Sequence, residues 1–328
     1  MGSIEINKTA DESYLNLLPN IDISPIFIMG DHRSGTTLLY KLLVATQCFN
    51  FVKAYHVIKY EEILSNYLNQ TENKVIKELE QLLRSLNINN RVIDNVEATP
   101  DLPEEYGFIL KNRGYELYLN SDNLFLFIEL CKKIQFISNL DRPLLVKNPW
   151  CFPHFIYVKK VSPKSKFIFI HRHPIHVINS KLKATRSILA AKNPYIALLS
   201  QMYTQIFKKP VQRFFYQALY SSYFNLGLRR VIQQSVQSTT YFLQNVDSLP
   251  NTDYVSVKYE DICHHPKATI FSILQFLGLQ SKADLAYETL IEPRSLNLLP
   301  EVQRKYKHIC QELKPYLSYH GYDTEGDV

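Results

Sequence analysis

Glycine is scarce in this chain: only nine of its 328 residues are glycine, less than half the usual share of about 7%. Two of them, Gly30 and Gly35, nevertheless stand five positions apart. Long apolar runs are also lacking, since none approaches the ~18 consecutive apolar residues of a membrane-spanning helix. Residues 1–20 contain no basic segment followed by an apolar one, so the sequence predicts no export signal and a cytoplasmic protein.

Cysteines are few and show no metal-binding spacing. The five cysteines are an odd set without a CxxC pair. Together with the missing export signal, this predicts reduced thiols and no zinc site. Hydrophobic residues make up 46% of the chain, and its formal net charge is +6. Such a composition allows a large buried core and suits a small anionic ligand better than a nucleic acid duplex.

Four short apolar segments predict the strands of a sheet, at residues 26–29, 144–146, 167–170 and 254–257. Each is continuously apolar, which is typical of strands that are buried on both faces of a parallel sheet. Helical patterns follow three of them. We therefore predict an α/β fold, with a three-layer parallel sheet of P-loop type, helices on both faces, and helical insertions.

The order of these patterns predicts one domain over residues 25–328, preceded by an extension over residues 1–24. The sheet core is expected at about 25–60, 144–186 and 250–280, and the helical insertions at about 61–140 and 187–249. The aromatic segment 187–215 is compatible with a lid or with ordinary core.

The segment GDHRSGTT, residues 30–37, follows the first predicted strand and leads into an apolar helix. A glycine-containing turn at a helix N-terminus presents free backbone N–H groups to an anion, and Thr36 and Thr37 add hydroxyl donors. The alternative is an ordinary tight turn between strand and helix. Kinases and NTPases carry G-x-x-x-x-G-K-[ST], but Thr36 takes the lysine position here and the cation is Arg33. This difference disfavours phosphoryl transfer from ATP.

The stretch P-x-x-x-x-G-x-x-R-S-G-T-T-L-L, residues 25–39, closely resembles the 5′-phosphosulfate loop of sulfotransferases that use 3′-phosphoadenosine 5′-phosphosulfate (PAPS). Three further segments resemble that family in the same order. FIFIHRHPIHVINS at 167–180 is similar to its 3′-phosphate motif, with Arg172 and Ser180 at the arginine and serine positions. LVKNP at 145–149 is similar to Leu-Lys-Ser-Pro, with Asn148 in place of serine. Residues 257–279 are similar to its Tyr-Glu-Asp…Phe-Leu-Gly-Leu stretch.

This resemblance implies a P-loop-like sulfotransferase that takes PAPS as co-substrate and needs no metal. It also implies a set of donor-binding residues: Arg33, Ser34, Gly35, Thr36, Thr37, Lys147, Arg172, Ser180 and Tyr259. Physical chemistry supports Arg172 independently, because an arginine just before a helix that begins with proline can offer a bidentate fork to phosphate. The alternatives are a capping role for Arg172, a solvent-exposed strand-end Lys147, and a packing role for Tyr259.

Sulfuryl transfer is an in-line displacement in which negative charge grows on the leaving oxygen, and Arg33 with the backbone N–H groups of the loop is placed to stabilise it. The family's general base is Glu, Asp or His. We predict His56, because it ends an expected extended run and its ordinary pKa suits proton abstraction near neutral pH. Glu105, in TPDLPEEYG at 99–107, is the second candidate, and Glu62 is a third. The alternative for His56 is a hydrogen-bonded packing role, and the alternative for the glutamates is a favourable position at a helix start.

Three functions follow from these residues. The first is sulfuryl transfer to a hydroxyl or amine of a small-molecule acceptor, with no nucleic acid partner and no membrane span. The second is a P-loop kinase or nucleotide hydrolase, which would bind ATP with Mg²⁺. The third is a nucleotide-binding module without catalytic activity. The sequence specifies neither the acceptor nor the oligomeric state.

Overall fold

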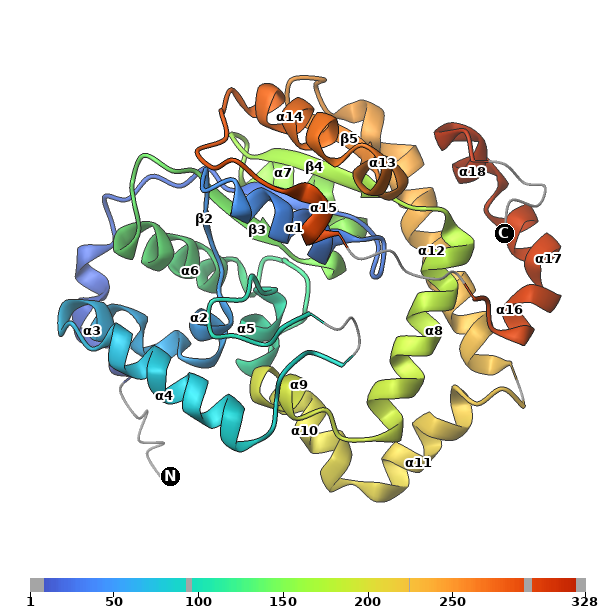
Figure 1. The fold of residues 1–328 in the computed structure, drawn as a ribbon, viewed down its shortest axis with the longest axis horizontal. Coiled ribbons are helices and arrows are strands. Elements are labelled where there is room, and N and C mark those ends of the chain that lie inside the picture. The colour runs from blue at the N-terminus through green and yellow to red at the C-terminus, as the bar shows by residue number, and fades with distance from the viewer. Residues whose placement is uncertain (1–8, 93–95, 224, 292–296, 323–328) are drawn as a thin grey trace.

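A five-stranded parallel sheet forms the centre of the molecule (Figure 1). The computed structural model describes residues 9–92, 96–223, 225–291 and 297–322. In spatial order the strands are β2 (Asn50–Phe51), β3 (Leu144–Lys147), β1 (Ile26–Met29), β4 (Lys166–His171) and β5 (Tyr254–Lys258). The α/β fold and the four predicted strands are confirmed, whereas the two-residue strand β2 was not predicted.

Strand β1 lies at the middle of the sheet. Phe27 pairs with Val146 of β3 on one side and with Phe167 of β4 on the other. Every residue of β1 is buried, because successive side chains of a strand point to opposite faces and both faces of this sheet are covered. The carboxyl ends of β1, β3, β4 and β5 therefore meet at one edge of the sheet.

One face of the sheet is covered by helices α1 (Thr36–Ala45), α13 (Tyr259–His264), α14 (Pro266–Leu277) and α15 (Tyr287–Leu290). Ile26 and Ile28 of β1 and Ile168 and Ile170 of β4 point into this layer. These apolar contacts bury the inner faces of α1 and α14, and so they hold the start of α1 against the carboxyl edge of the sheet.

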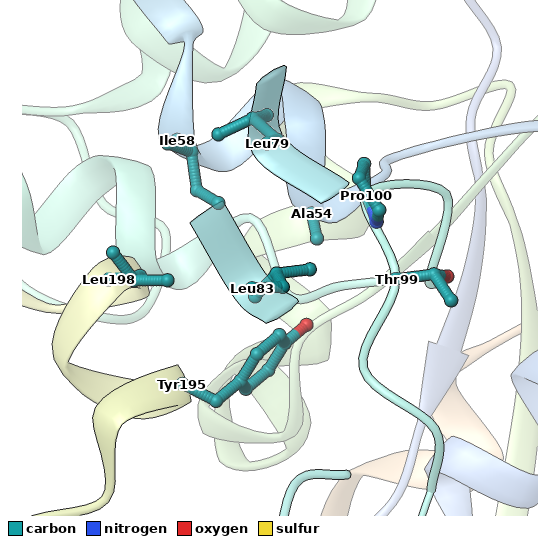
Figure 2. A pocket seen from close by; sticks show the side chains of 8 residues that line it. All are labelled: Ala54, Ile58, Leu79, Leu83, Thr99, Pro100, Tyr195 and Leu198. Atoms are coloured by element: carbon teal, nitrogen blue, oxygen red, sulfur yellow. The ribbon is translucent and has the colours of Figure 1, made fainter. Parts of the chain in front are cut away.

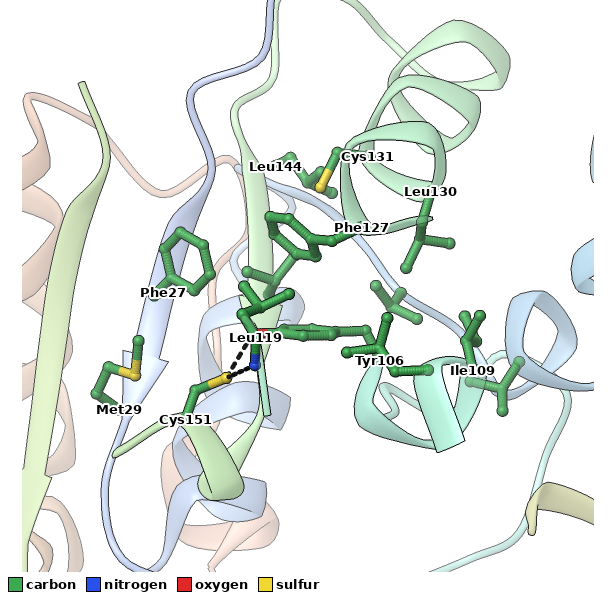
Figure 3. Packing of buried hydrophobic residues seen from close by; sticks show 14 of the residues in the cluster. Phe27, Met29, Tyr106, Ile109, Leu119, Phe127, Leu130, Cys131, Leu144 and Cys151 are labelled. Atoms are coloured by element: carbon green, nitrogen blue, oxygen red, sulfur yellow. Dashed lines mark hydrogen bonds between the residues drawn. The ribbon is translucent and has the colours of Figure 1, made fainter. Parts of the chain in front are cut away.

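The opposite face carries the larger core, to which Phe27 and Met29 contribute. Its helices are α5 (Gly107–Asn112), α6 (Leu124–Ile137), α7 (Phe155–Val161) and α12 (Leu226–Asn245). Figure 3 shows part of this packing: the thiol of Cys151 accepts a hydrogen bond from the backbone N–H of Leu119 at 3.3 Å and lies 3.1 Å from the Tyr106 hydroxyl. None of the five cysteines forms a disulfide.

The other helices surround this framework: α2 (Ala54–Ile58), α3 (Ile63–Leu68), α4 (Glu72–Ser85), α8 (Pro174–Ala190), α9 (Pro194–Leu199), α10 (Gln201–Lys208), α11 (Pro210–Leu219), α16 (Pro300–Arg304), α17 (Tyr306–Glu312) and α18 (Lys314–His320). Short 3₁₀ helices occupy Glu12–Leu17, Tyr60–Glu62, Pro149–His154 and Val246–Ser248. In Figure 1, α3, α4 and α6 lie to the left and α8, α12 and α16–α18 to the right, and α9–α11 run along the bottom. Within the described ranges, no helix is both long and apolar enough to cross a membrane.

One local prediction was wrong. The run before His56 is not extended throughout, because β2 ends at Phe51 and His56 lies in helix α2. The hydrogen bond from the backbone N–H of Lys53 to Nδ1 of His56, 3.1 Å long, stabilises the first turn of that helix.

Candidate active site

The loop after β1 has a backbone that requires glycine at two positions. A Cβ on Gly30 would lie 2.7 Å from the carbonyl oxygen of Ile170, and one on Gly35 would lie 2.2 Å from the ring of Tyr259. Gly35 has a φ of +101° and Arg33 a φ of +73°. Residues other than glycine rarely adopt such positive values. The loop therefore passes unusually close to β4 and to the start of α13.

Asp31 ties this loop to two helices. Its carboxylate accepts hydrogen bonds from Nζ of Lys181 in α8, at 2.7 Å to each oxygen, and from the Ser235 hydroxyl of α12 at 3.2 Å. Lys181 also donates to Ser235, at 3.0 Å. This three-residue cluster was not predicted, and only the position of Lys181 next to Ser180 hints at it in the sequence.

Two of the predicted donor-binding residues, Ser180 and Arg172, contact Arg33, and a third, Tyr259, contacts Arg172. Its Nε donates to the Ser180 hydroxyl of α8 at 3.1 Å. Arg172, directly after β4, donates from Nη1 to the backbone carbonyl of Arg33 at 3.3 Å. The guanidinium carbon of Arg172 lies 4.1 Å from the centroid of the Tyr259 ring, an arrangement that stabilises the cation over the aromatic face. The two motifs that were predicted as separate phosphate sites thus form one cluster.

The C-terminal residues reach back to the same region. Nδ1 of His171, the last residue of β4, lies 2.7 Å from the Tyr316 hydroxyl of α18. The Tyr322 hydroxyl donates to one oxygen of Glu260 at 3.0 Å, and the other oxygen accepts from the backbone N–H of His173 at 3.2 Å. The ends of β4 and β5 are therefore held together by the last described segment of the chain.

Lys147 connects the sheet to the start of α1. Its side chain is 0% exposed, and Nζ lies 3.0 Å from the Thr37 hydroxyl and 3.0 Å from Oε1 of Glu105. Burial on its own raises the pKa of Glu105, but nearby positive charge, that of Lys147 above all, lowers it to about 2. Glu105 is therefore an ionised carboxylate, joined to the loop region through one lysine.

The neighbouring glutamate has a different environment. Glu104 is fully buried, pairs with Arg91 at 3.0 Å, and accepts a hydrogen bond from the Tyr195 hydroxyl at 2.8 Å. Burial raises the pKa of Glu104. The Glu104 carboxylate links Arg91 to Tyr195 of α9, which is a structural role. Glu105 is the glutamate that faces the loop.

Tyr195 also borders an apolar pocket between α2, α4 and α9, which Figure 2 shows from close by. The pocket is lined by Ala54, Ile58, Leu79, Leu83, Thr99, Pro100, Tyr195 and Leu198. It leaves no room for a water molecule, so these side chains form a packed seam between the helices.

His56 and Glu62 have local partners. His56 is buried, and its Nδ1 accepts a hydrogen bond from the backbone N–H of Lys53. Its Nε2 has no hydrogen-bond partner among the residues that the structure describes. Burial lowers the pKa of His56 to about 3. Glu62 pairs with Lys59 at 3.1 Å beside a cavity of about 160 Å³. The catalytic role of either residue stays a prediction, and Glu105 is the candidate that is connected to the loop.

Comparison with known proteins shows to which family the chain belongs. The model of the sulfotransferase family matches residues 25–283. The chain belongs to the sulfotransferase family. Two sulfotransferases of known structure are similar to it: STF9 from Mycobacterium avium is 14% identical, with a TM-score of 0.63 over 96% of this chain and 82% of that one, and STF1 from Mycobacterium tuberculosis H37Rv is 14% identical, with a TM-score of 0.56 over 93% and 80%. None of the curated proteins matches the chain. The family that the four motifs predicted is confirmed.

The sulfotransferase carries one further feature at its loop. Burial lowers the pKa of His32, beside Arg33, to about 4, so its ring is neutral near pH 7. The ring packs edge-on against Trp150, with centroids 4.7 Å apart. No cluster of three or more histidine, cysteine or acidic side chains that could hold a metal occurs within the described part of the chain.

Proposed function

We propose that this sulfotransferase moves the sulfuryl group of PAPS to a hydroxyl or amine of a small-molecule acceptor. The observation that carries the proposal is the hydrogen-bonded contact of Arg33 with Ser180 and Arg172. PAPS has an anionic group at each end of its ribose, at the 3′ and 5′ positions. Two cationic sets side by side, on the loop and at the start of α8, fit such a ligand.

Buried donors at this place support the fit. The Ser34 hydroxyl and Nε of Arg172 are buried and have no hydrogen-bond partner among the described residues. A buried donor without a partner costs about 1–3 kcal/mol, and an anion in the loop would satisfy both groups. The backbone N–H groups at the N-terminus of α1 add further donors and the positive end of the helix dipole.

The same residues can stabilise the charge that develops during transfer. When the bond between sulfur and the leaving oxygen breaks, Arg33 and the N–H groups of Thr36 and Thr37 would face the oxygen that gains charge. Lys147 would reach the transferring group from β3 while it holds Thr37. Removal of one such donor typically costs about 3 kcal/mol in the activation barrier.

Glu105 is the general base that we favour. A carboxylate next to the loop can accept the proton of the acceptor hydroxyl or amine, provided that its basicity rises. Lys147 is shared between Glu105 and Thr37, so movement of its charge toward the bound donor would raise the pKa of Glu105. His56, the base that the sequence favoured, is the alternative. We place it second because its printed hydrogen bond, from the N–H of Lys53, lies within its own turn of helix and does not connect it to the loop.

Calorimetric titration with 3′,5′-bisphosphoadenosine, without metal, tests the donor site. We expect micromolar or tighter binding, at least a hundredfold weaker in Arg33→Ala and in Arg172→Ala. Arg229→Ala, which removes an exposed arginine of α12, is the matched control and should bind as the unmodified protein does. Absence of binding, or equal preference for ATP with Mg²⁺, would favour the kinase or nucleotide hydrolase.

Single-turnover transfer tests the base separately. Glu105→Gln keeps the size of the side chain, and we expect it to lower the rate at least a hundredfold with bisphosphate binding retained. If His56→Asn lowers the rate in this way and Glu105→Gln does not, His56 is the base. If PAPS binds and no acceptor is sulfated, the chain is a binding module.

A further inference from the structure

Two polar side chains of helix α11, Arg213 and Gln217, point toward α8. Nε of Arg213 and Nε2 of Gln217 donate to the carbonyl oxygen of Leu189 at 3.0 Å and 2.8 Å, and Nη2 of Arg213 donates to the carbonyl oxygen of Ala190. Both carbonyls lie at the C-terminal end of α8, where cationic and amide donors satisfy groups that the helix leaves free. The rotation of α11 about its axis is therefore determined by these hydrogen bonds.

This orientation turns the apolar side chains of α11 to solvent. Val211, Phe214 and Phe215 are 82%, 72% and 64% exposed, and no residue of α11 is buried. Their spacing of three and four residues places them on one face of the helix. We call these three side chains the α11 patch. Clusters of exposed aromatic residues on one face are uncommon in monomeric proteins unless they meet a partner.

The sequence segment that contains the α11 patch has basic residues and no acidic ones. Residues 142–246 contain sixteen lysines and arginines and no aspartate or glutamate, while the other 223 residues contain 21 lysines and arginines against all 31 acidic residues. Lys208 and Lys209, which directly precede α11, are exposed. Two carboxylates contact α8, and both are paired with cations: Glu301, which is buried, with Arg186, and Asp31 with Lys181.

From these observations we infer that the α11 patch docks on the surface of an anionic lipid bilayer. An outward apolar face flanked by lysines fits the boundary between headgroups and acyl chains, with the lysines beside anionic headgroups. Ten residues of helix span about 15 Å, too little to cross a bilayer, so α11 would lie in the plane of the interface.

The docked orientation has a geometric consequence for the donor site. Ser180, next to Arg33, and Leu189, which holds α11, are both on α8 and nine residues apart, or about 14 Å along the helix axis. Measured along α8, the loop after β1 would therefore lie about 14 Å from the docked helix.

Co-sedimentation with vesicles tests the docking. Vesicles of phosphatidylcholine are compared with vesicles that contain phosphatidylserine as well. We expect binding to the anionic vesicles, at least tenfold weaker in Phe214→Ser/Phe215→Ser and in Lys208→Glu/Lys209→Glu, and weakened by salt. Phe271→Ser is the matched control, since Phe271 of α14 is 66% exposed and outside the patch, and it should bind as the unmodified protein does. Binding of bisphosphoadenosine verifies that each variant is folded.

Three outcomes would overturn the inference. The first is absence of binding to anionic vesicles. The second is equal loss of binding in Phe271→Ser and in the double phenylalanine variant. The third is a dimer, measured by light scattering, that becomes monomeric in the double phenylalanine variant, which would assign the patch to contact between two copies.

Discussion

Substitution of Gly35 by alanine tests how closely the loop after β1 passes Tyr259. The new Cβ would lie 2.2 Å from Cδ2 and 2.9 Å from Cε2 of that ring, so the ring or the loop has to move. An alanine at a φ of +101° also costs about 1–2 kcal/mol in backbone strain. Overpacking of a tight contact costs about 1–3 kcal/mol. We therefore expect Gly35→Ala to lower the free energy of unfolding by about 2–5 kcal/mol.

Gly278→Ala separates the cost of backbone strain from the cost of overpacking. Gly278 follows α14 with a φ of +71°, and its Cβ would have no heavy atom within 4 Å. This control carries the backbone strain without the overlap, about 1–2 kcal/mol. Because Arg172 lies over the Tyr259 ring, movement of that ring in Gly35→Ala should also weaken bisphosphate binding at least tenfold. Gly278→Ala should leave binding unchanged.

Urea unfolding and calorimetric titration of the two variants provide the comparison. The slopes of the urea transitions should agree, so that a difference in midpoint reports stability alone. The reasoning would be refuted if Gly35→Ala were no less stable than Gly278→Ala and bound bisphosphoadenosine as tightly as the unmodified protein.

Three further expectations concern the charged groups around the loop. Lys147→Met leaves the Glu105 carboxylate buried without its partner and should cost about 3–5 kcal/mol in urea unfolding; a loss below about 1 kcal/mol would contradict a tightly coupled pair. Because the pKa of Glu105 is about 2 in the folded protein, below its ordinary value, the stabilisation from its charge is complete above about pH 4.5 and is lost as pH falls toward 2. In urea titrations between pH 3 and 6, Glu105→Gln should remove the loss of stability that protonation of Glu105 causes. An unchanged pH profile of stability would exclude a contribution from the Glu105 charge. Lys181→Met frees Asp31 from its ion pair and should weaken bisphosphate binding about tenfold in calorimetry, an effect comparable to about 1.4 kcal/mol; unaltered affinity would show that Asp31 does not position the loop.

The sheet was largely predictable from the sequence because its strands are continuous apolar segments. Strand β2 was not, since two residues carry no periodicity. It forms through its pairing with β3 and through Asn50, whose side-chain amide donates to the carbonyl oxygen of Asn139 at 2.7 Å. The segment up to His56 was predicted as extended, but helix α2 begins within it, at Ala54. Tertiary contacts determine both features.

The site was predictable where a motif lies within one segment. Arg172 and Ser180 stand at motif positions, and the parallel sheet brings them to the loop. Asp31, Lys181 and Ser235 belong to three distant segments, so their contact could not be predicted from sequence spacing. Glu105 was predicted as a candidate base, but the sequence did not show how Glu105 differs physically from Glu104. That difference follows from the hydrogen bond of the Glu104 backbone N–H to the carbonyl oxygen of Val52 at 2.8 Å, which fixes the direction in which each neighbour points.

The contacts of Tyr316 and Tyr322 determine how short a working version of this enzyme can be. The region shared with the family ends at residue 283, but the hydroxyls that meet His171 and Glu260 come from after it. A chain cut at the end of the shared region would remove the Tyr316 hydroxyl from the buried ring of His171 and the Tyr322 hydroxyl from Glu260. The smallest transplantable catalytic unit therefore extends through the last turn of α18 and includes Tyr322.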